Sequence, residues 1–142
     1  EKAAVDVSAG SEGLLVMPYW AGVMSPYWDG AARGAIVGLS LDHEPKHLFR
    51  AVLEGIAFEQ AIASEAMETQ AGGKPAAVIA AGGWFPSPET AAEAMAARPT
   101  RHVEPVEGLI SGYRARKAIY RDLYRATRDI HARLDALSEA SG

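Results

Sequence analysis

Short apolar runs near the start and in the middle of the chain predict three strands. The first is LLVMPY at 14–19 and the second is AIVGLSL at 35–41, while the third, AAVIAA at 76–81, ends at a pair of glycines. Apolar runs of this length, bounded by glycine or proline, are typical of buried strands. We therefore expect strands at these three places.

Two longer segments repeat apolar residues at helical spacing. The first runs from Asp42, a candidate N-cap ahead of Pro45, to about Gln70 and ends before AGGKP, which predicts an amphipathic helix of some 25 residues. Its predicted apolar face comprises Phe49, Val52, Leu53, Ile56, Phe58 and Ile62. The second helix is predicted from about 111 to 137. Its apolar face comprises Tyr113, Tyr120, Leu123, Tyr124, Ile130, Leu134 and Leu137.

The order of elements predicts the fold class. A short alanine-rich helix at 88–97 and an extended piece follow the third strand, so the order is strand, strand, helix, strand, helix, extended piece, helix. This is a mixed α/β order. The loop at 20–34 carries Trp20, Tyr27 and Trp28, and we expect these aromatic side chains to be packed, because water is a poor environment for their rings.

Composition narrows the classes of partner and compartment. A chain of 142 residues with 49% apolar and 23% charged residues suits one globular domain with a core. A net charge of −4 argues against binding to nucleic acid or to an anionic membrane surface. No run approaches the roughly 18 apolar residues of a membrane span. The chain has no cysteine, which excludes disulfides and fits a reducing compartment. We expect a soluble cytoplasmic protein.

Two patterns are candidates for binding chemistry. His43 and His47 are four residues apart, a spacing that suits a shared metal on a helix, but no third ligand is near, so we expect capping and packing roles and no metal site. Gly82 and Gly83 follow the third apolar run, where a backbone without side chains can approach a ligand at the end of a strand. We find no catalytic acid–base set with usable spacing and name no catalytic residue.

The segment GAIVGLSLDHEPKHLFRAVLEGIAFEQ resembles a known family. Gly34, Ile36, Gly38 and Leu39, then, after seven residues, His47, Leu48, Ala51, Val52, Leu53 and Glu54 fit the second signature of the FGGY carbohydrate kinases. The preceding loop, PYWDGAARG at 26–34, is similar to the family pattern P-Y-W-D-P-x-A-R-G, with Gly30 in place of proline.

The resemblance implies an actin-like kinase of two ribonuclease H-like domains, of which this chain would be part of the second: a short mixed sheet with packed helices. It implies ATP and Mg²⁺ as cofactors and a sugar or polyol as substrate of the complete enzyme. It places Gly82 and Gly83 at the turn beside the adenosine. Gly55 interrupts a strong helix at a cost of about 1 kcal/mol, and the resemblance implies that it leaves room for a close contact between helix and sheet.

The resemblance weakens beyond the paired glycines. Trp84 follows them directly, where the family continues with a third glycine, a strand and further helices, and the segments at 83–105 and 113–134 are similar to later parts of the family sequence. We therefore expect a single partial C-terminal domain over 1–142, with an internal deletion whose junction lies near 82–84.

The expected function follows from the parts of the family that this sequence does not match. The resemblance places the catalytic aspartate and both phosphate hairpins in other parts of the kinase, so we expect a truncated sugar-kinase domain that is inactive alone. One alternative is a portion of an active kinase that another polypeptide, a complementing kinase domain, completes. Another alternative is a binding module without enzyme activity that assembles with itself as a homo-oligomer.

Overall fold

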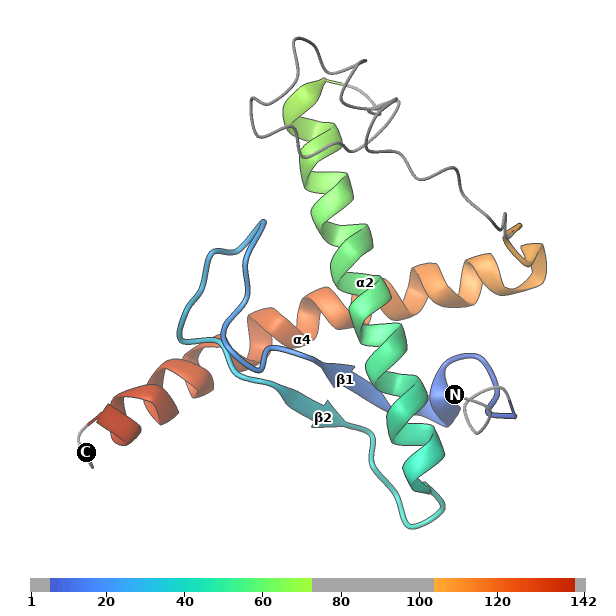
Figure 1. Ribbon diagram of the computed structural model, residues 1–142, viewed down its shortest axis with the longest axis horizontal. Coiled ribbons are helices and arrows are strands. Elements are labelled where there is room, and N and C mark those ends of the chain that lie inside the picture. Colours follow the sequence, from blue (N-terminus) through green and yellow to red (C-terminus); the bar gives the residue numbers. More distant parts are fainter. Residues whose placement is uncertain (1–5, 73–103, 140–142) are drawn as a thin grey trace, which may run out of the picture.

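The computed structural model of the protein describes residues 6–72 and 104–139 (Figure 1). Strand β1, Leu15–Met17, follows a 3-10 turn at Ser11–Gly13 and pairs antiparallel with β2, Ala35–Val37. Two helices complete the described fold, α2 at Pro45–Ala71 and α4 at Glu107–Glu139. The predicted mixed α/β class is confirmed. The expected strand at 76–81, the expected helix at 88–97 and the junction near 82–84 lie outside the described residues.

Strand β2 is shorter than its apolar run. The prediction of a strand over 35–41 is wrong after Val37, because Gly38 has φ of 87° and turns the backbone out of the extended region. A Cβ at Gly38 would lie 2.5 Å from the carbonyl oxygen of Gly13, so this turn requires glycine. Beyond the turn, the side chain of Leu41 is fully exposed.

Helix α2 has the predicted length but a different first turn. Its N-cap is Glu44 and Pro45 is the first helical residue, so the prediction of Asp42 as N-cap is wrong. The backbone N–H of Glu44 donates to Nδ1 of His47 at 2.8 Å, which satisfies one donor at this helix end. At the other end Gly72 adopts the left-handed conformation, with φ of 71°, and ends the helix as predicted.

Helix α2 buries a narrower face than its apolar pattern predicts. Phe49, Leu53 and Ile56 are 45 to 48% exposed, so their prediction as core residues is wrong. The buried positions are His47, Ala51, Gly55, Phe58 and Ile62. Small residues at 51 and 55 allow the helix to approach β1 closely, and this contact decides which side of the helix faces the sheet.

Gly55 sits at the closest approach of α2 to β1. A Cβ at this position would lie 2.2 Å from the carbonyl oxygen of Val16 and 3.3 Å from Cδ of Pro18. No side chain fits there without moving the helix or the strand. The interpretation of Gly55 as room for a close helix–sheet contact is confirmed.

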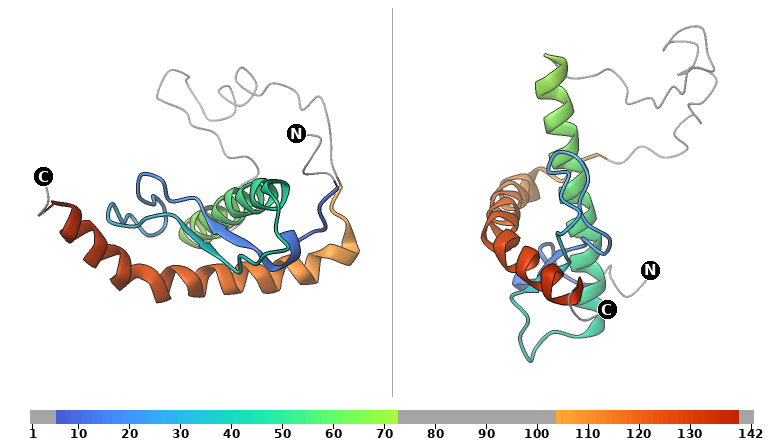
Figure 2. Two further views of the ribbon diagram at one scale, coloured as in Figure 1. Left: turned by 90° about the horizontal axis from the view of Figure 1, so that it is seen from below. Right: turned by 90° about the vertical axis from the view of Figure 1, so that its left-hand side faces the viewer.

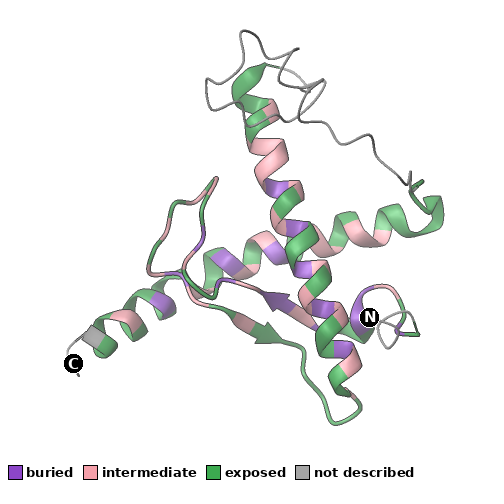
Figure 3. Cartoon of the chain, in the orientation of Figure 1, coloured by how far each residue is buried: buried purple, intermediate pink, exposed green. Residues whose placement is uncertain are grey.

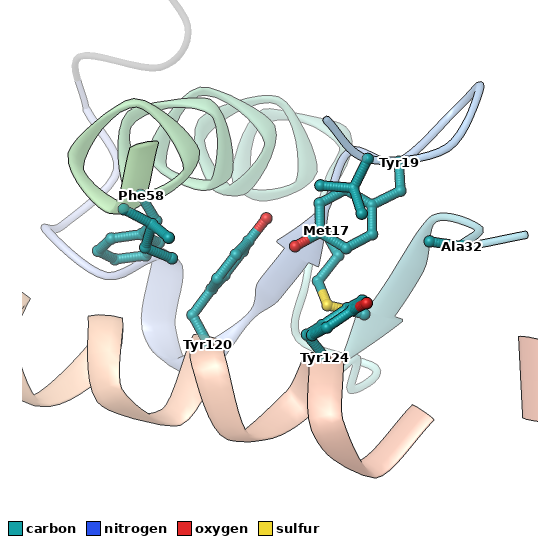
Figure 4. Close-up of a cluster of buried hydrophobic side chains, with 8 residues drawn as sticks. Met17, Tyr19, Ala32, Phe58, Tyr120 and Tyr124 are labelled. Carbon is teal, nitrogen blue, oxygen red and sulfur yellow. The ribbon is translucent and has the colours of Figure 1, made fainter. Parts of the chain in front are cut away.

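The sheet lies between the two helices, which cross one another (Figures 1 and 2). Helix α4 begins at Glu107, four residues before its predicted start, and directs Tyr120 and Tyr124 toward β1 and α2 (Figure 4). The main core cluster is formed by Met17, Tyr19, Val23, Ala32, Phe58, Ile62, Tyr120 and Tyr124.

The C-terminal part of α4 extends past the sheet and is largely exposed (Figures 1 and 3). Ile130, Leu134 and Leu137 were predicted on the apolar core face, but they are 51, 52 and 66% exposed. The buried residue on this part of the helix is His131, 5% exposed. The prediction of these three residues as core is therefore wrong, because the described sheet ends before it reaches them.

Candidate functional site

Asp29 holds the loop between the two strands in place. Its Oδ1 accepts hydrogen bonds from the backbone N–H of Ala31 and Ala32, at 3.0 and 3.2 Å. Its Oδ2 accepts from the Tyr124 hydroxyl at 2.9 Å, and the ring of Tyr27 stacks on that of Tyr124 with centroids 4.0 Å apart. The loop is thereby bound to α4 at its base.

The tryptophans of this loop are on the surface. Trp20 is 66% exposed and Trp28 is 72% exposed, so the prediction that the loop packs all its aromatic rings is wrong for both. Trp28 has φ of 50°, an uncommon conformation for a residue with a side chain. The two tyrosines pack differently: the hydroxyl of Tyr19 donates to Oε1 of Glu59 at 2.7 Å, and the ring of Tyr27 is held by its stack on Tyr124.

Glu54 joins three segments that are far apart in the sequence. Its Oε1 accepts from the backbone N–H of Gly10 at 2.9 Å, from Nε of Arg50 at 3.0 Å and from the hydroxyl of Tyr113 at 2.8 Å. Its Oε2 lies 3.5 Å from Oγ of Ser11. The side chain is 10% exposed. This saturated carboxylate holds the N-terminal turn, α2 and α4 together.

A groove of about 640 Å³ opens beside Glu54, between α2 and the first turns of α4. Its walls are mainly apolar, with Leu53, Ala57, Phe58 and Ala61 from α2 and Val106, Leu109, Ile110 and Tyr113 from α4. Arg50, Arg114 and Lys117 add positive charge at its border. Such a lining suits an apolar or amphipathic occupant, because several apolar walls converge on a few polar groups.

Burial keeps the tyrosines of this region neutral. Burial raises the pKa of Tyr19 and of Tyr120, and the hydroxyl of Tyr19 donates to Oε1 of Glu59 at 2.7 Å, which raises the pKa of Tyr19 further. Burial likewise raises the pKa of Tyr113. The hydroxyl of Tyr120 has no hydrogen-bond partner within the described residues. The hydroxyls of Tyr19 and Tyr113 therefore act as neutral donors, to Glu59 and Glu54.

A second polar contact joins the two helices on the other side of the crossing. Glu65 of α2 forms ion pairs with Lys117 and Arg121 of α4. The hydrogen bond from Lys117 lowers the pKa of the Glu65 carboxyl, and that from Arg121 lowers it further. The side chain of Glu65 is 42% exposed, so solvent screens these pairs.

The structure describes some of the residues predicted for binding and not others. Gly82 and Gly83, the predicted cofactor turn, lie outside the described residues. His43 and His47 serve the predicted local roles: Nδ1 of His43 accepts from the backbone N–H of Ser40 at 2.9 Å, and His47 caps α2. Across 6–72 and 104–139, no three metal-binding side chains come together.

Sequence reasoning missed Glu54 as the central polar residue. It lies in the family signature, yet apart from Arg50 its partners are about 40 and 60 positions away in the sequence, and a local pattern does not show such contacts. The available signal was the glycine that follows it, because Gly55 marks the turn of α2 that packs closely on β1.

Comparisons with known proteins agree with the resemblance. The family described as "FGGY family of carbohydrate kinases, C-terminal domain" matches residues 1–116. The chain is 43% identical over 83 residues to the xylulose kinase of Lactococcus lactis and 42% identical over 73 residues to the glycerol kinase of Vibrio vulnificus. These alignments cover 58 and 51% of this chain and 17 and 14% of those proteins.

A solved structure shows the same fold over most of the chain. The crystal structure of xylulose kinase from Rhodospirillum rubrum aligns with a TM-score of 0.65 at 21% identity, covering 92% of this chain and 34% of that one. The chain thus spans a small part of the curated relatives that it matches. The helices of the described part give no segment long and apolar enough to cross a membrane.

Proposed function

Because the chain belongs to the FGGY family of carbohydrate kinases, with its residues 1–116 matching the C-terminal domain, we propose that it is a partial ribonuclease H-like domain of an ATP-dependent sugar kinase. The observation that carries this proposal is the close packing of α2 on β1 at Gly55, within the residues that fit the family signature. The overall likeness to a solved kinase fold supports it. The substrate of the complete enzyme would be a sugar or polyol.

The proposed nucleotide contact lies at Gly82 and Gly83. The family resemblance implies that these residues lie beside the adenosine of ATP, while Mg²⁺ would bind through the phosphates and residues of other parts of the kinase. Two of the described carboxylates do not suit the metal, because Glu54 is saturated by hydrogen bonds and Glu65 is paired with two cations. When bound, MgATP would supply the transferred phosphoryl group.

We propose further that the polypeptide of 142 residues transfers no phosphate by itself. A deletion near 82–84 would remove one wall of the adenosine pocket, and the phosphate hairpins and catalytic aspartate of the family match nothing in this sequence. Phosphoryl transfer depends on positioning and electrostatic stabilisation by such groups. A coupled ADP-release assay with xylulose and with glycerol should give no turnover above the blank.

A chimera tests the family role independently of activity in the isolated chain. The 83 aligned residues of the L. lactis xylulose kinase are replaced by those of this chain, and ATP-dependent phosphorylation of xylulose is measured. We expect activity within about 100-fold of the parent, because the aligned part would keep the shape of the domain. The same chimera with Gly55→Leu is the control and should lose activity. A chimera that melts like the parent but has no activity would contradict the proposal.

Two alternatives to this function would each give a different experimental result. If a second polypeptide that carries the kinase parts with no match in this sequence restores turnover, the chain is one portion of a complementing active kinase. If the chain forms a stable homo-oligomer and ATP does not bind, a module without enzyme activity is favoured. The exposed apolar residues of α4 favour this second alternative, because they offer a surface for a second copy of the chain.

A further inference from the structure

One side of α4 carries a largely apolar row, most of which the described fold leaves exposed. Ile119 and Ile130 are 60 and 51% exposed and Leu137 is 66% exposed. Leu123 is partly buried and Ala126 is exposed on the same row. We call this row the α4 seam, defined by Ile119, Leu123, Ala126, Ile130, Arg133 and Leu137.

The seam lies beside the core face of α4 and meets it at Leu123, which packs against the main core cluster. Ile119, Leu123 and Ile130 each come one residue before a buried side chain, Tyr120, Tyr124 and His131. One residue is about 100° around a helix, so the seam faces sideways while the tyrosines face the sheet. The helix can therefore make a second contact without disturbing the first.

The spacing of the seam indicates what kind of surface would cover it. Its positions follow one another at intervals of four, three, four, three and four residues. This is the repeat by which one helix packs its side chains into the spaces of another helix. A flat sheet or a small ligand would not require it. The partner that the seam fits is a helix with the same repeat.

We propose that the α4 seam binds the α4 seam of a second copy of this chain, with the two helices antiparallel about a two-fold axis. In this arrangement Ile119 lies opposite Leu137 of the second copy, and Ala126 lies opposite its Ile130, so that a small residue faces a large one. In a two-fold contact the same residues of both copies form the interface, so the seam must be complementary to itself.

Charge decides between the two directions of packing. In a parallel pair Arg133 would face Arg133 of the second copy within the seam, and the like charges would repel one another. In the antiparallel pair Arg133 lies opposite Leu123 and next to Asp122 of the second copy. Asp122 is 72% exposed and is paired with Arg125 only at the surface, so its carboxylate is available to this cation. Two symmetric ion pairs result.

The size of the contact predicts a weak dimer. The seam spans 18 residue steps, from Ile119 to Leu137, which is about 27 Å of helix. Helix pairs of this length bury less than the roughly 1,200 Å² of a standard stable interface. We expect a dissociation constant on the order of 10–100 µM. This proposal does not depend on the kinase role, because it uses α4 alone.

Sedimentation of the full chain over a range of roughly 5 to 500 µM, chosen to bracket that constant, tests the contact. We expect a monomer–dimer equilibrium, and at least a roughly tenfold weaker dimer for Ile130→Glu. Leu41→Glu, which changes a fully exposed leucine away from the seam, is the matched control and should leave the equilibrium unchanged. Circular dichroism of each variant checks that the helices are kept. A monomer throughout, or a dimer that Leu53→Glu weakens and Ile130→Glu does not, would overturn the proposal.

Cross-linking tests the direction of packing, since the natural chain has no cysteine. Chains with Ile119→Cys are mixed with chains with Leu137→Cys and oxidised. The antiparallel pair should join one chain of each kind, whereas a parallel pair would join Ile119→Cys chains to each other. The charge exchange Asp122→Arg with Arg133→Asp should restore the dimer that either single change weakens. Disulfides between two Ile119→Cys chains would overturn the antiparallel arrangement. A charge exchange that does not restore the dimer would overturn it as well.

Discussion

At Gly55, glycine lowers the stability of the helix but permits a close contact with the backbone of β1. Alanine would favour the helix by about 1 kcal/mol in open space. Here the added Cβ would lie 2.2 Å from the carbonyl oxygen of Val16, a backbone atom that cannot rotate away. The sequence allowed this contact to be predicted, because a glycine within a strong helix commonly marks a place where another segment packs closely. It could not identify which atom is touched.

Gly55→Ala should destabilise the protein in spite of its better helix propensity. We expect a net loss of about 1–3 kcal/mol from forced movement of α2 away from β1, and a melting temperature lower by roughly 5–15 °C. The matched control is Gly108→Ala in α4, where the added Cβ meets nothing within 4 Å and a gain of up to about 1 kcal/mol is expected. Equal melting temperatures for the two variants would contradict the contact.

Among the elements, the ends of α2 were easier to predict than its faces. Pro45 and Gly72 are local signals, and the helix begins and ends at them. The buried face depends on which strand lies beneath it, and spacing alone does not contain that information. For the same reason, the apolar pattern of α4 assigned residues of two different helix surfaces to one predicted core face. Tyr120 and Tyr124 face the sheet, while Ile130 and Leu137 face outward.

The first turn of α2 gives a test of its cap. His47→Ala should cost about 1–2 kcal/mol, because the N–H of Glu44 loses its acceptor and a buried ring is removed. Asp42→Ala should change the free energy of unfolding by less than about 0.5 kcal/mol, as expected for a surface position outside the helix. Urea unfolding of the two variants measures both values. A larger loss for Asp42→Ala would restore Asp42 as the cap.

The contact between α2 and α4 at Glu65 should depend on acid. Because Lys117 and Arg121 lower the pKa of the Glu65 carboxyl, its contribution is complete above the ordinary glutamate pKa and is lost as the pH falls through the lowered value. The pair is exposed, so the effect should be at most about 1 kcal/mol. Melting curves of the natural protein and Glu65→Gln should therefore differ near neutral pH and converge on acidification. A constant difference would contradict the ion pairs.

For the molecule as a whole, the sequence predicts the family but does not predict which polar side chains contact one another. The signature from Gly34 to Glu54 is contiguous, so it is visible in the sequence. Glu54 and Tyr113 meet only because two helices cross, and they are 59 residues apart. The groove beside them could not be predicted for the same reason, because its two walls come from helices that are far apart in the sequence.

Nucleotide binding can be tested on the whole chain by thermal stability. With a dissociation constant of about 1 mM or weaker, about 1 mM ATP stabilises the folded state by at most about 0.4 kcal/mol. The expected rise in melting temperature is therefore below about 3 °C. Gly83→Ala is the control, since it changes the proposed adenosine turn. A rise above about 5 °C that Gly83→Ala abolishes would show a tighter nucleotide site than we propose.

The late position of α4 in the chain has a consequence during synthesis. β1, β2 and α2 are complete once residue 72 is made, but Tyr120 and Tyr124, which cover Met17 and Phe58, follow about 50 residues later. At roughly 5–20 residues per second, the ribosome leaves that side of the sheet bare for about 3–10 s. A nascent chain in this interval presents apolar side chains and a short strand pair, the features that chaperones and proteases act on. Its yield in a cell should therefore depend on translation speed between residues 72 and 124.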